Sequence, residues 1–105
     1  MRFLSDEFNF KTSTVSFGYL RDVVDYYKKN IKNASSVQLQ QAYQHTAQMR
    51  GVTYDAVSMG VYRAIDTSIP YSKINDKYPN IQRSLGIKEI IVRFAKICLE
   101  EGCEF

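Results

Sequence analysis

The sequence is poor in the residues that would tie it to a secreted or membrane protein. Its 105 residues include only two cysteines, Cys98 and Cys103, too few for a disulfide framework and not spaced as a C-x-x-C pair. A reducing compartment is therefore expected, and we predict a cytoplasmic protein. No run approaches the roughly 18 apolar residues of a membrane span, so no membrane partner is expected. The first ten residues include Arg2, Asp6 and Glu7 and predict no signal peptide.

Signatures of catalysis and metal binding are equally scarce. The one histidine, His45, stands among polar residues without an acidic or thiol neighbour in sequence. Cys98 and Cys103, with the glutamates around them, match no common zinc spacing. There is no glycine-rich phosphate loop and no nucleophile elbow. We therefore predict no catalytic, metal-binding or cofactor-binding residues, and a protein that is not an enzyme.

What the chain does have is a composition that fits one globular domain. Hydrophobic residues make up 45% and charged residues 24%, and the formal net charge is +3 with a sequence pI near 8.9. Such a chain can bury one modest core. The charge permits nucleic-acid binding without requiring it, because dedicated DNA-binding modules are often more basic.

Apolar residues recur at helical spacing through most of the chain. The pattern predicts four helices, over residues 17–31, 36–50, 54–68 and 87–101. Ser16 and Ser35 are the expected N-caps of the first two, Gly51 ends the second, and Thr53 caps the third. In the last helix, Cys98 and Leu99 belong to the expected core face, and Cys103 lies at an end that we expect to fray.

Two segments lack this periodicity. Residues 1–16 predict an extended N-terminal arm whose phenylalanines, Phe8 and Phe10, dock on the helical core or on a second subunit. Residues 70–86 contain both prolines and predict a loop. The fold expected is therefore all-α, a small helical bundle made of residues 17–105 with the arm of residues 1–16.

The most informative stretch runs from Tyr43 to Ile65. Two helices are joined by a short turn with Gly51 at its start, and the small Ala47 four residues earlier lets the helices approach closely. This arrangement is typical of a helix-turn-helix, whose second helix enters the DNA major groove. An ordinary helical hairpin within a small bundle fits the same pattern.

The order of segments also resembles a known family. Phe17-Gly18-Tyr19-Leu20-Arg21, the segment from Tyr43 through Ala47 to the 53–65 helix, and the final helix from Lys88 to Leu99 are similar to the C-terminal DNA-binding effector domain of the stage-zero sporulation response regulator of endospore-forming Firmicutes. The resemblance covers roughly residues 17–100. It implies a compact helical fold with a central helix-turn-helix, and a C-terminal helix, residues 87–101, that is available to pair two subunits.

The sequence departs from this family where DNA would be read. The family's recognition helix carries arginines at positions that align here with Ala56, Met59 and Tyr62. Base reading usually relies on bidentate Arg, Asn or Gln contacts, and Arg63 is the one such group on this surface. Asp55 at the start of the helix would repel phosphate.

The candidate DNA-binding residues come from this helix and from nearby cations. They are Arg50, Thr53, Tyr54, Asp55, Ser58, Met59, Tyr62, Arg63, Lys73 and Lys77, with Arg83 as a further source of positive charge. Hydroxyl groups of this set can donate to phosphates, and Met59 can touch a thymine methyl group.

Two functions remain open at this point. The first is a small transcriptional regulator that binds double-stranded DNA, as a dimer. The second is a degenerate helix-turn-helix that acts as a protein-interaction module and modulates another regulator. A continuous positive stripe around residues 50–63 would favour DNA, whereas a neutral surface with Met59 and Tyr62 exposed would favour a protein partner.

Overall fold

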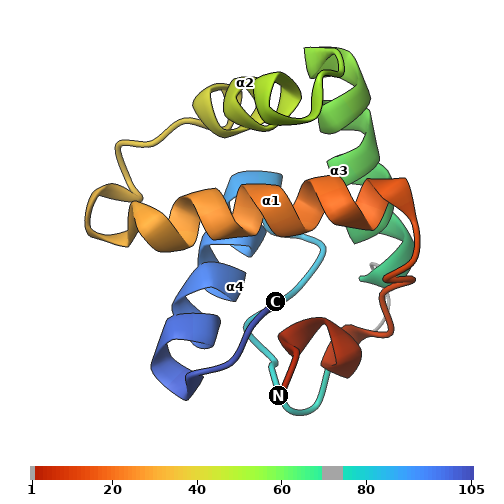
Figure 1. Ribbon diagram of the computed structural model, residues 1–105. Coiled ribbons are helices and arrows are strands. Elements are labelled where there is room, and N and C mark those ends of the chain that lie inside the picture. Colours follow the sequence, from red (N-terminus) through yellow and green to blue (C-terminus); the bar gives the residue numbers. More distant parts are fainter. Residues whose placement is uncertain (1, 70–74) are drawn as a thin grey trace.

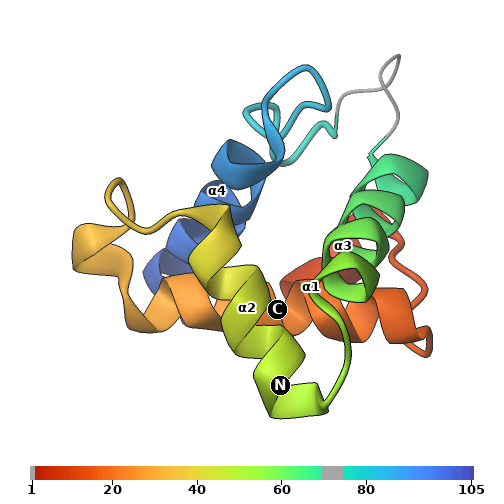
Figure 2. The same ribbon diagram turned by 90° about the horizontal axis from the view of Figure 1, so that it is seen from above.

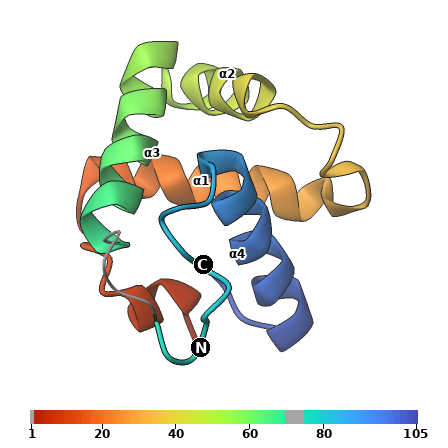
Figure 3. The ribbon, with the colours of Figure 1, turned by 180° about the vertical axis from the view of Figure 1, so that it is seen from behind.

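The computed structural model describes residues 2–69 and 75–105 and confirms an all-α fold for them. The described helices are α1 (Val15–Lys29), α2 (Leu39–Arg50), α3 (Tyr54–Ser68) and α4 (Ile87–Glu101), with 3₁₀ helices η1 (Leu4–Phe8) and η2 (Ile31–Asn33). Figures 1 and 3 show α1 running through the middle of the bundle, in contact with each of the other three α-helices. Within the described residues, every helix is too short or too polar to cross a bilayer.

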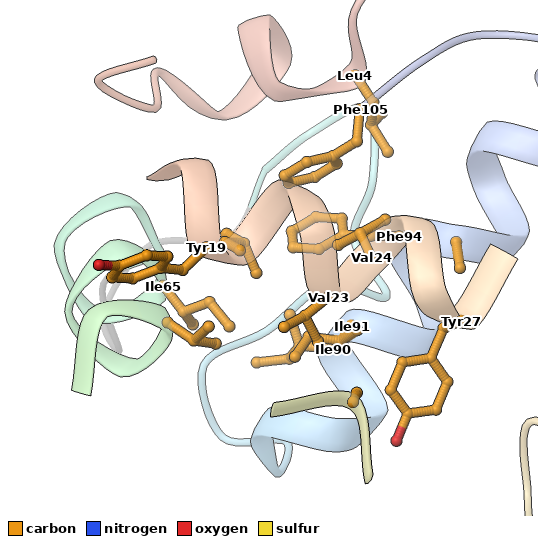
Figure 4. Close-up of a cluster of buried hydrophobic side chains, with 14 of the residues drawn as sticks. Leu4, Tyr19, Val23, Val24, Tyr27, Ile65, Ile90, Ile91, Phe94 and Phe105 are labelled. Atoms are coloured by element: carbon orange, nitrogen blue, oxygen red, sulfur yellow. The ribbon is translucent and has the colours of Figure 1, made fainter. Parts of the chain in front are cut away.

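The core forms where the apolar face of α1 meets α4. Val23 and Val24 are fully buried among Ile90, Ile91 and Phe94 (Figure 4). The i, i+3, i+4 spacing of the apolar residues explains this contact, because it places them on one side of each helix. The face predicted for the last helix is therefore confirmed in its main part.

The N-terminal arm is not extended, as the sequence suggested, but partly helical. Leu4–Phe8 forms η1, and Asn9 follows in a left-handed conformation with φ 58°. The ring of Phe10 packs against Phe17 at 5.5 Å and Phe105 at 5.5 Å between centroids. Of the two docking sites considered for the phenylalanines, the arm uses the helical core of its own chain.

The first two helices begin at other residues than predicted. Thr14, not Ser16, caps α1, and its Oγ1 accepts a hydrogen bond from the Phe17 amide at 3.2 Å. The second helix starts at Leu39 because Val37 is buried in non-helical backbone whose carbonyl accepts a hydrogen bond from the Tyr27 hydroxyl at 2.9 Å. The tertiary contact to α1 thus overrides the local capping signal at Ser35.

The C-terminal segment is ordered, in contrast to the frayed end that we expected. Gly102 ends α4 with φ 63°, and the chain then turns back so that Cys103 and Phe105 are buried. An isolated parallel bridge joins Phe3 to Glu104, and the two ends of the chain meet there (Figure 1). Leu99, predicted to be in the core, is 48% exposed because it lies on the outer side of α4.

Candidate DNA-binding face

The turn between α2 and α3 has the local geometry that its sequence predicts. Gly51 adopts φ 65°, a left-handed conformation that glycine reaches without strain, and ends α2. The amide of Val52 donates to the carbonyl of Ala47 at 3.0 Å, a hydrogen bond that closes the C-terminal end of α2. Thr53 then caps α3 by accepting from the Ala56 amide at 3.1 Å. The two helices run across each other rather than side by side (Figure 1).

The orientation of α3 is set by its contact with α1. Val57, Val61 and Ile65 are fully buried on the side of α3 that faces the core. Gly60 lies against the Tyr19 ring so closely that a Cβ there would be 2.6 Å from Cδ2 of Tyr19. Viewed from above, α3 crosses the N-terminal half of α1 (Figure 2). One side of α3 is thus fixed and the opposite side is free to contact another molecule.

We call this opposite side the α3 face, and define it as Asp55, Ser58, Met59, Tyr62 and Arg63. The spacing i, i+3, i+4, i+7, i+8 places all five on one side of the helix. Met59 is 52% and Tyr62 50% exposed, and a shallow hollow lies between Ser58, Met59, Tyr62 and Arg63. The α3 face carries one carboxylate and one guanidinium, so its formal charge is balanced.

The polar side chains on and near the α3 face differ in whether they already form contacts within the protein. The Ser58 hydroxyl donates to the carbonyl of Asp55 at 3.2 Å, so its proton is engaged within the helix. Tyr54 packs its ring against Tyr43 of α2 at 5.7 Å and is 38% exposed, which joins the two helices. Within residues 2–69 and 75–105, Arg63 forms neither an ion pair nor a side-chain hydrogen bond, and it is exposed.

Arg50, a candidate phosphate contact, is held by α1 instead of pointing freely outward. Its Nε donates to Oδ2 of Asp22 at 2.5 Å, and its guanidinium lies 5.3 Å from the centroid of the Tyr19 ring. The hydrogen bond to Asp22 raises the pKa of Arg50, which stays charged. Its charge is nevertheless matched by a neighbouring carboxylate, so it adds little positive potential to the α3 face.

Lys77, one of the two lysines expected to supply affinity, does not lie at α3 either. The ammonium of Lys77 lies 2.9 Å from Oε1 of Glu7, on the side of the molecule where the arm meets the loop of residues 75–86. Lys73 lies outside the described residues. A continuous positive stripe around residues 50–63 is therefore not among the features of the described chain.

Among the candidate cations within residues 2–69 and 75–105, Arg83 is the one that the fold buries. It is 7% exposed, its Nε donates to Oδ1 of Asp66 at 3.1 Å, and its guanidinium lies 5.3 Å from the centroid of the Tyr62 ring. The charge of Arg83, named as a further source of positive charge, is therefore matched by a carboxylate within the protein. Sequence reasoning did not single out Asp66, although its position seven residues after Met59 places it beside the α3 face. Arg83 instead neutralises Asp66 and supports Tyr62 from the loop.

No second centre of chemistry accompanies this face in the described part of the chain. His45 stacks on Tyr26 with 5.0 Å between ring centroids, on the outer side of α2. Among residues 2–69 and 75–105, no group of three or more His, Cys, Asp or Glu side chains is arranged to hold a metal ion. Comparison with family models, with curated proteins and with solved structures yields no match.

Proposed function

We propose that the protein binds double-stranded DNA through the α2–α3 hairpin, used as a helix-turn-helix, and acts as a small transcriptional regulator. The observation that carries this proposal is the placement of α3. Its core side is fixed on α1 through Gly60 and Tyr19, and the α3 face lies free along the first three turns of the helix. A helix presented in this way fits the major groove.

The α3 face supplies a small set of groups for DNA. Arg63 is exposed and unpaired in the described chain, so it is available for a bidentate contact with guanine. Met59 offers an apolar tip for a thymine methyl group, and the Tyr62 hydroxyl can donate to a phosphate. Asp55 at the N-terminus of α3 opposes phosphate binding by charge repulsion.

This balance of charge predicts weak binding with a shallow dependence on salt. Each phosphate neutralised by a cation contributes about −0.9 to the slope of log K against log [salt]. With Arg63 as the unpaired cation of the α3 face, we expect a slope of about −1, far shallower than that of strongly basic DNA-binding domains. Asp55→Asn removes the opposing charge and should strengthen binding.

The proposal is tested by titrating labelled random-sequence duplex with the protein at two salt concentrations and following fluorescence anisotropy. Arg63→Ala should weaken binding by about 1–3 kcal/mol. Arg93→Ala is the matched control, because Arg93 lies on α4 and pairs with Glu89 at 2.9 Å. If Arg63→Ala and Arg93→Ala bind DNA as tightly as the unchanged protein, the α3 face does not contact DNA.

A protein partner at the same face is the second candidate, and the exposure of Met59 and Tyr62 favours it. Half-exposed apolar side chains on a charge-balanced helix are typical of protein interfaces. If the protein shows no DNA binding at low salt, a partner captured from its native cell extract should be lost with Met59→Ser or Tyr62→Ser. Retention of the partner by both variants would exclude the α3 face from this role as well.

A further inference from the structure

A groove lies at the far end of α1 from α3. It runs between the segment that follows α1, which includes η2, and the N-terminal half of α4, and it encloses about 580 Å³. η2 contacts α4 directly, and Figure 2 shows this part of the chain and α3 at opposite ends of the molecule. A ligand in this groove and one on the α3 face can therefore bind at the same time.

The bottom of the groove is apolar. Ile31, Ala34 and Val92 line it, and none of them forms part of the α3 face. Leu99 lies seven residues after Val92, so it continues the same stripe along α4. Its 48% exposure, which the core does not explain, extends the apolar surface beyond the groove.

The rim of the groove is basic. Lys32, Lys88 and Lys96 line it, together with the single carboxylate of Glu89. That carboxylate pairs with Arg93 at 2.9 Å, so it does not neutralise the lysines. Lys88 donates to the carbonyl of Ser35 at 3.2 Å, a contact that leaves its charge unmatched. The groove thus combines an apolar bottom with an excess of positive charge.

We propose that this groove binds an acidic, amphipathic segment of a partner protein. The apolar side chains of the segment would lie on Ile31, Ala34 and Val92, and its carboxylates would meet Lys88 and Lys96. Charge complementarity favours this occupant over a second copy of the chain. In a two-fold dimer the same patch faces itself, which would bring the basic rim against its own copy.

The test uses the full chain and a fluorescein-labelled synthetic amphipathic helix of leucine and glutamate, with a leucine–lysine helix of the same pattern as the control probe. The unchanged protein should bind the acidic probe and not the basic one. The double variant Lys88→Glu/Lys96→Glu should weaken binding by about tenfold or more, because like charges then face each other. Leu99→Ser, an exposed substitution, should weaken it without loss of stability.

Lys11→Glu is the control for a charge reversal elsewhere on the surface, since Lys11 is exposed on the arm, and it changes the net charge by half as much as the double variant. It should bind the acidic probe like the unchanged protein, and equal weakening by Lys11→Glu would overturn the proposal. Measuring DNA binding with the same variants distinguishes a ligand of this groove from a ligand of the α3 face. If the double variant loses DNA instead of the acidic probe, or dissociates a dimer seen by sedimentation, the groove belongs to DNA or to a second copy.

Discussion

The replacement of Gly60 by alanine tests how α3 is held. In an ordinary exposed helix this change stabilises the helix by about 1 kcal/mol, because alanine has the higher helix propensity. At Gly60 the new Cβ would lie 2.6 Å from Cδ2 of Tyr19 and 3.4 Å from Cα of Ser16. The first distance is too short for two carbon atoms, so either the Tyr19 ring or the whole of α3 must move.

Neither movement is cheap. The Tyr19 ring is 8% exposed, and the Arg50 guanidinium covers it at 5.3 Å from the centroid. Overpacking of this kind costs about 1–3 kcal/mol, which exceeds the gain in helix propensity. We therefore expect Gly60→Ala to lower the free energy of unfolding by about 1 kcal/mol and to weaken DNA binding, because α3 is displaced from α1.

Urea unfolding, followed by circular dichroism, measures the change. The midpoint should fall by about 0.3–1 M at an unchanged m-value. Gly18→Ala is the control, because its Cβ would meet only the guanidinium end of Arg50, at 3.0 Å from Nη2. The guanidinium can shift at the expense of its contacts with Asp22 and Tyr19, and this loss offsets the gain in helix propensity, so Gly18→Ala should be nearly neutral. A higher midpoint for Gly60→Ala than for the unchanged protein would refute the close contact with Tyr19.

Three further changes test other parts of the structure. Gly51→Ala should lower the free energy of unfolding by about 1–2 kcal/mol, because alanine is strained at φ 65°. Asparagine adopts this conformation more readily, so urea unfolding should show a smaller loss of stability for Gly51→Asn. Burial raises the pKa of Asp25, so folding favours its neutral form and stability falls as the pH rises through about 4. Asp25→Asn should therefore raise the urea midpoint of unfolding at neutral pH and leave this midpoint unchanged well below about pH 4. Burial also raises the pKa of Cys98 to about 12, so iodoacetamide should alkylate it only after unfolding, and rapid alkylation of the folded protein would contradict its burial.

The ends of a helix could be predicted where the residue that precedes the helix and the spacing of its apolar residues indicate the same boundary. The boundaries of α3 and α4 match the predicted ranges of residues 54–68 and 87–101, because Thr53 directly precedes one apolar stripe and Gly86 the other. The first two helices differ because their limits depend on contacts made elsewhere in the fold. The Tyr27 hydroxyl, which donates to the carbonyl of Val37, keeps the start of α2 from being helical, and no local pattern reports that contact.

The sequence predicted which residues share the exposed side of α3, but it did not predict which nearby cations pair with carboxylates. Spacing along one helix sufficed to place Met59, Tyr62 and Arg63 on one side of α3. The surroundings of Arg50 and Arg83 could not be predicted, because each pairs with a carboxylate, Asp22 or Asp66, that lies more than a dozen residues away in the sequence. Ion pairs of that separation follow from the packing of helices and cannot be read from spacing.

The net charge of +3 does not by itself indicate DNA binding. What it indicates depends on where the cations without a carboxylate partner lie. Three of the candidate cations in the described chain, Arg50, Lys77 and Arg83, each have a carboxylate partner, whereas Arg63 forms no ion pair there. Three of the lysines that form no ion pair within residues 2–69 and 75–105 line the groove beside α4, namely Lys32, Lys88 and Lys96. If DNA binding proves steeply dependent on salt, the phosphates must contact cations outside the α3 face, of which the lysines of that groove are the main cluster, because the α3 face alone offers only Arg63. If the salt dependence of DNA binding is shallow, the α3 face and the groove act separately, and the basic groove remains available for an acidic partner.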